Sequence, residues 1–441
     1  MSAASSIDPD SLLMLLIESA PDEATRDIAM HVQSHFEQRL WYEFSEALVE
    51  LMTRSSAIRA LALSIHDALV VRVRLELSPD IYTKLIYFAA SQASTTAGGS
   101  TTAVAAADTP VDDDARGSGG AFHSLLMLLD GAAATLSSSQ APQHVRAVHC
   151  IRALVLMQFG PDVEARRIIL DVRDFLQTIP SQDLSALLQA LYHRALVCQC
   201  EQQRDHDQFY RVVFPFVTYA QAAGIPVFAD ELFVLSYKTA IAALLSKDVF
   251  NFGQLVNFAP FRPFFEQQAD GEGSKQTSKN AFAASNPLCA VVMRIVTYCN
   301  GGEIAALEAY VKEHREAIAA APDLHSAFAS GRLGRKVRLM ALLHFVYFTP
   351  PNQRTFTFAS IADRCALPVT DVEVLVLSAF AQKLIQGKID GLNGTVECTW
   401  AQPRILSLAE IRQLAGNIGA WRKEVEAVSR HMAEISKDIP K

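Results

Sequence analysis

The chain has 441 residues, of which 50% are hydrophobic and 20% are charged, a balance that can bury a large core spread over about three domains. Its formal net charge of −8 excludes the basic surplus that is typical of nucleic-acid-binding proteins. Seven cysteines scattered without a repeating framework argue against a disulfide-rich secreted domain and indicate reduced thiols in the cytosol or nucleus.

Residues 1–93 predict a set of N-terminal helical repeats. The first apolar run follows Asp8 and Asp10, where a signal peptide would carry positive charge, so we expect a capped amphipathic helix there. The sequence contains no uninterrupted apolar stretch of about 18 residues, and we therefore expect no membrane-spanning helix.

Apolar periodicity is lost in two segments, 94–120 and 267–286. Both are rich in small and polar residues, which cannot bury enough apolar surface to offset the entropy lost on ordering, so we expect flexible insertions. Elsewhere, residues 121–331 carry successive amphipathic patterns separated by short polar turns. These patterns predict a solenoid of antiparallel helix hairpins, although no fixed period identifies a particular repeat family.

The sequence pattern of residues 332–404 differs from the repeated helical pattern before it and predicts a winged helix. Thr370 and Glu373 are spaced as a capping box, in which each side chain satisfies a backbone N–H group at the start of a helix that runs to Leu384. Gly391–Gly394 is a turn signal between two alternating segments, which indicates a β-hairpin. The predicted elements are a helix over 332–348, a strand over 354–358, helices over 360–365 and 370–384, and strands over 387–390 and 395–400.

Residues 405–441 predict one long helix with a heptad pattern, opened by a second capping box from Ser407 to Glu410. Spacing of alternately three and four residues places a narrow apolar stripe on one side, as in helices that pack lengthwise against others. Gly416 and Gly419 each weaken the helix by roughly 1 kcal/mol relative to Ala, so we expect it to rely on partners. This stripe, called the seam below, consists of Ile411, Leu414, Ile418, Trp421, Val425, Val428, Met432 and Ile435.

A winged helix suggests DNA binding, but the charges of this one argue against it. Residues 355–400 contain three basic and five acidic residues. Asp371 and Glu373 stand at the start of the helix that would enter a major groove, where phosphates would repel them. The exposed strand of the wing is more typical of a protein-binding edge.

The motifs of common enzymes are missing from the sequence. It contains no His-x-His pair of the kind a zinc-dependent deubiquitinase uses, and His314 does not belong to a His-Glu-x-x-His motif. Cys198 and Cys200 could bind a soft metal, but they lack a second ligand pair at zinc-finger spacing, so we interpret them as structural. We therefore expect no catalytic residue, no cofactor and no metal site.

Three segments resemble the family of the 26S proteasome non-ATPase regulatory subunit 13: Val249–Val256, Pro368–Leu408 and the helix around Trp421. More loosely, Leu40–Leu51 is similar to the family's N-terminal helix pair. Helical repeats followed by an acidic winged helix are the layout of the PCI domain, found in the proteasome lid, the COP9 signalosome and a translation initiation factor. The family signature and the predicted edge of the wing comprise Val396, Cys398, Thr399, Trp400, Gln402, Pro403 and Arg404.

The resemblance implies a non-catalytic scaffold subunit of the proteasome lid in the cytoplasm and nucleus. Its expected partners are the other PCI subunits, joined edge to edge, and the deubiquitinase pair, whose C-terminal helices would join its own in a bundle. The seam is the surface that such a bundle requires, so we expect Trp421 at an interface and Trp400 in the core. Two alternatives remain: a PCI scaffold of the signalosome or initiation factor, or a winged-helix nucleic-acid regulator.

Overall fold

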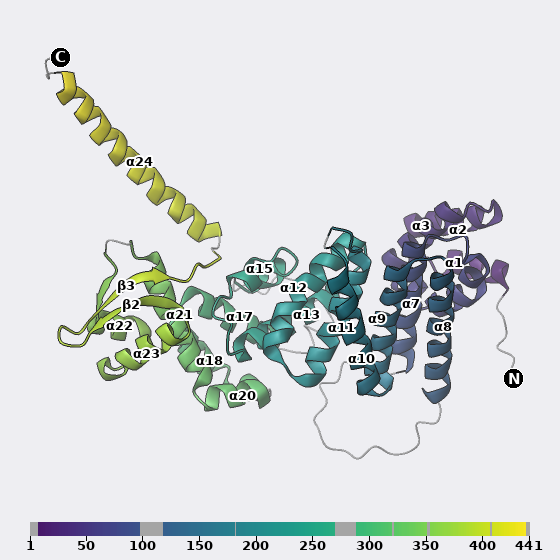
Figure 1. Ribbon diagram of the computed structural model, residues 1–441, viewed down its shortest axis with the longest axis horizontal. Coiled ribbons are helices and arrows are strands. Elements are labelled where there is room, and N and C mark those ends of the chain that lie inside the picture. Colours follow the sequence, from purple (N-terminus) through teal and green to yellow (C-terminus); the bar gives the residue numbers. More distant parts are fainter. Residues whose placement is uncertain are drawn as a thin grey trace. The chain divides into compact units, whose positions relative to one another are not determined.

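The computed structural model describes residues 8–97, 118–180, 182–269, 288–319, 322–350, 353–405 and 408–437. These residues form helices and one small sheet, and they divide into two units, residues 1–228 and 229–441. The predicted fold class is confirmed: a mainly helical chain in which helical repeats precede a winged-helix module and a long last helix (Figure 1). No helix in the described ranges combines the length and the apolar character needed to cross a membrane.

Every regular element among the described residues of the first unit is a helix. Consecutive helices pack against each other, most extensively α2 with α3, α9 with α10, and α11 with α12. The elements are α1 (Pro9–Glu18), α2 (Glu23–Glu37), α3 (Trp41–Arg54), α4 (Ser56–Arg59), α5 (Ala62–Ile65), the π-helical η1 (His66–Val70), α6 (Val71–Val73), α7 (Pro79–Ala97), α8 (Ser118–Ser138), α9 (Pro142–Phe159), α10 (Asp162–Thr178), α11 (Ala186–Gln203) and α12 (His206–Ala223).

The local sequence explains where these helices begin and which of their sides is buried. In α10, Ala165, Ile169 and Val172 recur at helical spacing and are buried, while the charged residues between them face solvent. Asp205 caps α12 by accepting a hydrogen bond from the backbone N–H of Gln208 (3.0 Å).

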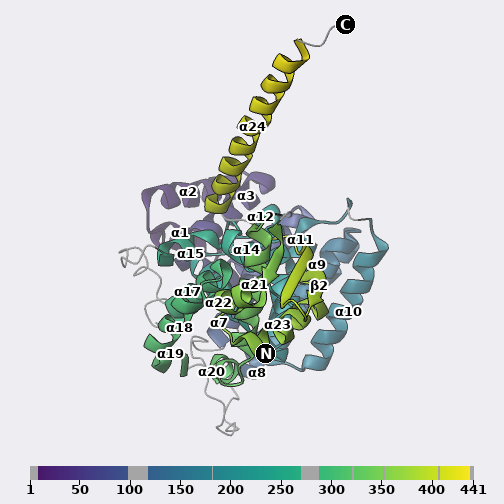
Figure 2. The same ribbon diagram turned by 90° about the vertical axis from the view of Figure 1, so that its left-hand side faces the viewer.

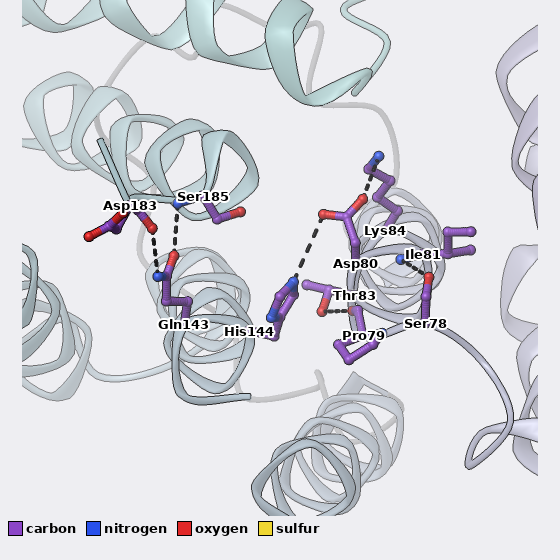
Figure 3. A network of polar contacts seen from close by, with 10 residues as sticks. All are labelled: Ser78, Pro79, Asp80, Ile81, Thr83, Lys84, Gln143, His144, Asp183 and Ser185. Atoms are coloured by element: carbon purple, nitrogen blue, oxygen red, sulfur yellow. Dashed lines mark hydrogen bonds and ion pairs between the residues drawn. The ribbon is translucent and has the colours of Figure 1, made fainter. Parts of the chain in front are cut away.

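A polar network joins α7, α9 and the segment that precedes α11 (Figure 3). Asp80 on α7 accepts a hydrogen bond from Lys84 (2.8 Å) and lies 3.9 Å from the ring of His144 on α9. His144 and then Lys84 hold the pKa of Asp80 below its usual value, because both favour the charged carboxylate. Gln143 donates a hydrogen bond to the carbonyl oxygen of Asp183 (2.9 Å), so neighbouring repeats are linked by polar contacts as well as by apolar packing.

The second unit begins with helices and ends with the winged-helix module and the last helix. Within it, α17 packs against α13, α15, α18 and α21, and α21 packs against α22, α23 and the sheet. The elements are α13 (Ala229–Leu245), α14 (Gly253–Asn257), α15 (Arg262–Ala269), α17 (Leu288–Gly301), α18 (Ile304–Glu313), α19 (Arg315–Ala319), α20 (Pro322–Ala329), α21 (Arg332–Phe348), β1 (Thr355–Thr357), α22 (Phe358–Cys365), α23 (Val369–Ala381), β2 (Ile385–Asp390), β3 (Thr395–Ala401) and α24 (Leu408–Lys437).

The sheet of the winged-helix module has the order β1-β3-β2, with both neighbours antiparallel to β3. The Asp390 carboxylate accepts backbone hydrogen bonds from Leu392 (3.0 Å) and Asn393 (3.1 Å), and Gly394 adopts a positive φ of 60°. These features close the predicted hairpin turn. Thr357 links β1 to α22, because its hydroxyl accepts a hydrogen bond from the backbone N–H of Ser360 (3.3 Å).

Some expected boundaries are wrong. The capping box at Thr370 does not form: α23 begins at Val369 after Pro368, its N-cap makes no side-chain hydrogen bond, and the helix ends at Ala381 rather than Leu384. Pro368 takes the N-cap position with an extended backbone (φ −65°, ψ 148°), and its ring has no oxygen that could accept a hydrogen bond from the first turn.

The ends of the two expected insertions belong to helices. Residues 94–97 and 118–120 form the end of α7 and the start of α8, and α15 extends to Ala269. Residues 98–117 and 270–287 lie outside the described part of the chain, as does Ser407 of the second capping box.

Candidate functional site: the exposed seam of the last helix and its anchor

The last helix, α24, is a single helix of 30 residues, and both ribbon views draw it without a break (Figures 1 and 2). Seven of the eight seam side chains are between 47% and 66% exposed, although all seven are large and apolar. The eighth, Ile435, lies in the helix, but its side chain is outside what the structure describes. An apolar stripe of this length left open to water is a surface that association with another helix would cover.

Two glycines inside α24 lower the intrinsic stability of this helix. Gly416 and Gly419 lie in its interior, and a Cβ atom built on either would meet no atom within 4 Å. Neither glycine is therefore required by packing within this chain, while each costs roughly 1 kcal/mol of helix stability relative to Ala. On the exposed surface, Arg422 and Glu426 form an ion pair of 2.8 Å one turn apart, which contributes about 0.3–0.5 kcal/mol.

The segment that leads into α24 is fixed to the rest of the unit through Arg404. This side chain is 9% exposed, and its Nη2 donates a hydrogen bond to the backbone oxygen of Asn300 at the end of α17 (2.6 Å). The same nitrogen lies 3.3 Å from Oδ1 of Asn300. Hydrogen bonds from a guanidinium are charge-assisted and stronger than neutral ones, so Arg404 anchors the segment that precedes the last helix to α17.

A second contact joins the same segment to α14. A Cβ atom on Gly253, the first residue of α14, would lie 2.3 Å from the carbonyl oxygen of Ile405. Only glycine lets the two backbones approach this closely. Nearby, the N–H of Gln402 donates a hydrogen bond to the carbonyl oxygen of Leu384 (2.8 Å). Residues 402–405 are therefore held by three contacts, made by Gln402, Arg404 and Ile405. Below, residues 402–405 together with Gly253 and Asn300 are called the anchor.

The anchor brings together two of the segments that carry the family resemblance. Gly253 belongs to Val249–Val256, and Arg404 belongs to the signature that follows the wing. Sequence reasoning quoted both segments but did not predict that they meet. Asn300 was missed altogether, because a backbone carbonyl that accepts a hydrogen bond leaves no pattern in the sequence.

The predicted edge of the wing is corrected by the sheet order. The residues Val396, Cys398, Thr399 and Trp400 lie on β3, which is the central strand, whereas β1 and β2 form the two outer strands. The sequence pattern shows which residues alternate on a strand, but strand order depends on which partners pair with it. Of the two outer strands, β2 is longer than β1. The longer edge of the sheet is therefore the outer edge of β2, residues 385–390.

Trp400 is not a core residue, contrary to expectation. Val396 and Cys398 on β3 are buried, but Trp400 is 40% exposed. Gly387 pairs with Cys398 and Gln386 pairs with Trp400, so a β-bulge leaves one extra residue on β3 between these two pairs. The extra residue reverses the alternation, and Trp400 turns away from the face that Val396 and Cys398 share.

The cysteines have the environment of structural rather than reactive thiols. Burial raises the pKa of Cys150 and of Cys299 to about 12, because a thiolate loses its hydration there. Cys200, which we interpret together with Cys198 as a structural cysteine, has its pKa raised to about 11, first by burial and then by Asp205. Within the described residues, no group of three or more His, Cys, Asp or Glu side chains is placed to hold a metal ion.

Comparisons with known proteins cover both units. A family model described as PSD13 N-terminal repeats matches residues 28–269, and a PCI domain model matches residues 311–400. The 26S proteasome non-ATPase regulatory subunit 13 homolog A of Arabidopsis thaliana is 22% identical over 66% of this chain and 67% of its own length. The corresponding subunit 13 of Dictyostelium discoideum is 25% identical over 53% of this chain and 54% of its own length. Eukaryotic translation initiation factor 3 subunit M of Aspergillus terreus matches at 24% over 51% of this chain and 47% of its own length.

Proposed function

This chain belongs to the PSD13 family, and on that premise we propose that it is a non-catalytic scaffold subunit of the 26S proteasome regulatory particle. In this role it supports ubiquitin-dependent protein degradation by positioning neighbouring subunits of the lid. The family match over residues 28–269 carries the proposal, and the relatives in Arabidopsis thaliana and Dictyostelium discoideum that bear the names of proteasome regulatory subunits support it.

The proposed binding surface is the seam of α24. Its partners are the C-terminal helices of the other PCI subunits and of the deubiquitinase pair, gathered in one bundle. Covering seven half-exposed apolar side chains removes apolar surface from water at about 25 cal/mol per Å², before the entropy cost of association is subtracted. Heptad spacing lets these side chains interlock along the full length of a partner helix.

The anchor supports this role by limiting how α24 can move at its start. A helix bound at one end to a folded unit searches a smaller volume for its partners than a helix on a free linker, so less entropy is lost on binding. Arg404 and Gly253 therefore contribute to assembly by positioning α24, without touching the partner themselves. A second contact, between the winged helices of neighbouring subunits, would use the outer edge of β2.

The proposed locations are the cytoplasm and the nucleus, and the proposed state is a hetero-oligomer without cofactor. Initiation factor 3 subunit M is the relevant alternative, since it matches about half of this chain. The PCI fold and the seam suit either assembly, so only the partners distinguish them.

The experiment is affinity purification of the tagged full-length chain from its own cells, followed by native gel electrophoresis and mass spectrometry. We expect it to migrate with ATPase, lid and peptidase-core subunits, in a band that hydrolyses a peptidase substrate. Recovery with initiation-factor or signalosome subunits would contradict the proteasome assignment while retaining the PCI scaffold role. Recovery of the chain alone would contradict both.

A further inference from the structure

The helix α23 of the winged-helix module is apolar on two sides, although the chain covers only one of them. The covered side, where α23 packs against α21, α22 and β2 (Figure 1), consists of Val372, Leu375, Val376 and Ala379. On the other side, Val374 is 63% exposed and Leu377 is 52% exposed. Helices that are apolar all round are typically buried on all sides, so the exposed side indicates a surface that a partner covers.

The exposed side of α23 has the spacing of a helix–helix contact. Its residues follow one another at intervals of four, three and four, and all are exposed: Thr370, Val374, Leu377 and Ala381. These four residues are called the α23 face below. Such intervals align the side chains in one stripe along the helix. None of the four side chains is charged or long, so a second helix can approach the stripe closely.

The hydroxyl groups on and beside the α23 face already have partners within the helix. Ser378 donates a hydrogen bond to the carbonyl oxygen of Val374 (2.7 Å), and Thr370 donates one to the carboxylate of Asp371 (3.3 Å). Covering a polar group is costly mainly where its hydrogen bonds are left unmade. A partner can therefore cover the α23 face without leaving these two hydroxyl groups unpaired.

The charges beside the α23 face are acidic. At 3.6 residues per turn, Asp371 lies on one flank of the stripe and Glu373 on the other, and both are exposed. Apart from the hydrogen bond between Thr370 and Asp371, neither carboxylate forms an ion pair or hydrogen bond with the residues that the structure describes. The sequence of α23 contains no basic residue; Arg364 precedes it and Lys383 follows it. Basic side chains on both sides of a partner's apolar stripe would complement these carboxylates.

We propose that the α23 face binds a basic amphipathic helix of another protein, with aliphatic residues at the same spacing and Lys or Arg beside them. The apolar stripe supplies affinity, and the acidic flanks select the partner. A second copy of the α23 face would offer acidic rather than basic flanks, and the same carboxylates repel nucleic acid. With 13 residues, α23 is about 20 Å long, so the contact is small and typical of a transient complex. This proposal concerns a different surface from the seam and does not depend on the proteasome role of the chain.

The test measures how the full-length chain binds two fluorescently labelled peptides of the same length as α23. Both peptides carry Leu at intervals of four, three and four; the flanking positions are Lys in the first peptide and Glu in the second. In fluorescence anisotropy we expect the Lys peptide to bind at least about ten-fold more tightly, and the difference to shrink as ionic strength rises. Equal binding of the two peptides, or no binding of the Lys peptide, would overturn the proposal.

Two double variants test the stripe and its flanks separately. Val374→Gln with Leu377→Gln should weaken binding of the Lys peptide at least about ten-fold, because the aliphatic contacts are lost. Both side chains are exposed, so this variant should keep the far-ultraviolet circular dichroism of the parent chain. Asp371→Asn with Glu373→Gln leaves the stripe in place and should remove most of the preference for the Lys peptide over the Glu peptide. An unchanged preference would contradict the assigned role of the two carboxylates.

The matched control removes an exposed Val and an exposed Leu from another helix, through Val163→Gln with Leu170→Gln on α10. It should change the dissociation constant of the Lys peptide by less than about two-fold. Equal losses in the control and in the Val374 and Leu377 variant would mean nonspecific attachment to apolar surface and would overturn the site. Unchanged binding by the latter variant would also overturn it. If sedimentation showed a dimer of the parent chain and a monomer of that variant, a second copy would occupy the face and the proposal would be wrong.

Discussion

The helices α21 and α24 lie in the same unit and both carry an apolar stripe, yet the chain covers only the first. Leu333, Val337, Met340, Leu343 and Val346 on α21 are at most 3% exposed, because α17, α22, α23 and the sheet pack around them. The seven seam side chains of α24 that the structure describes are at least 47% exposed. The comparison shows that periodicity predicts a helix and its apolar side, whereas the covering of that side depends on contacts far along the chain or on another molecule.

The largest expected effect is a difference in stability between substitutions in the buried stripe of α21 and substitutions in the exposed seam of α24. Leu343→Ala should lower the free energy of unfolding of the isolated chain by about 2–5 kcal/mol, because it leaves a cavity in a packed core. Val428→Ala on the seam is the control and should change the free energy of unfolding by less than about 0.5 kcal/mol. Urea unfolding followed by circular dichroism measures both. Similar losses would indicate that the seam is already covered in the isolated chain.

The next effect concerns the anchor at Gly253. The change Gly253→Ala forces the backbone at Ile405 to move, since the new Cβ would lie 2.3 Å from its carbonyl oxygen. We expect a loss of about 1–3 kcal/mol in the free energy of unfolding. Gly334→Ala, at an open position within α21, is the control and should be neutral or stabilising by up to about 1 kcal/mol. Equal stability of the two variants would show that the contact with Ile405 is not needed.

Arg404→Ala should act on the same anchor, with a loss of about 1–3 kcal/mol, because the oxygen of Asn300 loses its donor. Combining it with Gly253→Ala sharpens the test. Two changes that release one segment should cost less together than the sum of their separate effects. Strict additivity in urea unfolding would mean that the two contacts work independently and that residues 402–405 are not one anchor.

The smallest effect concerns the two glycines of α24. Replacing Gly416 and Gly419 with Ala should stabilise the isolated helix by roughly 1 kcal/mol each, since both positions are open. Amide hydrogen exchange within 408–437 should slow accordingly. Unchanged exchange would show that contacts with other parts of the chain already hold the helix.

The sequence was sufficient where local chemistry decides the structure. The expected helix over 332–348 matches α21, and Asp390, Asn393 and Gly394 form the hairpin turn that their side chains favour. The seam was found in full as a pattern, and its assignment as a partner interface stays a prediction. Its exposure in the structure is the condition that this assignment requires.

The sequence was insufficient where the structure depends on partners distant along the chain. A bulge opposite Gly387 turns Trp400 outward, and its position cannot be inferred from alternation within β3 alone. Likewise, most of the second unit separates Gly253 from Ile405 along the chain, so their close approach appears only once the fold brings α14 next to residues 402–405.

The most direct test of the assembly role uses Trp421→Ala with Val425→Ala in the full-length chain. These side chains are 65% and 49% exposed, so the isolated variant should unfold at the same urea concentration as the parent. In cell extracts run on a native gel, its incorporation into the proteasome regulatory particle should fall clearly below that of the parent. Normal incorporation of the folded variant would contradict the account that the seam is an assembly surface.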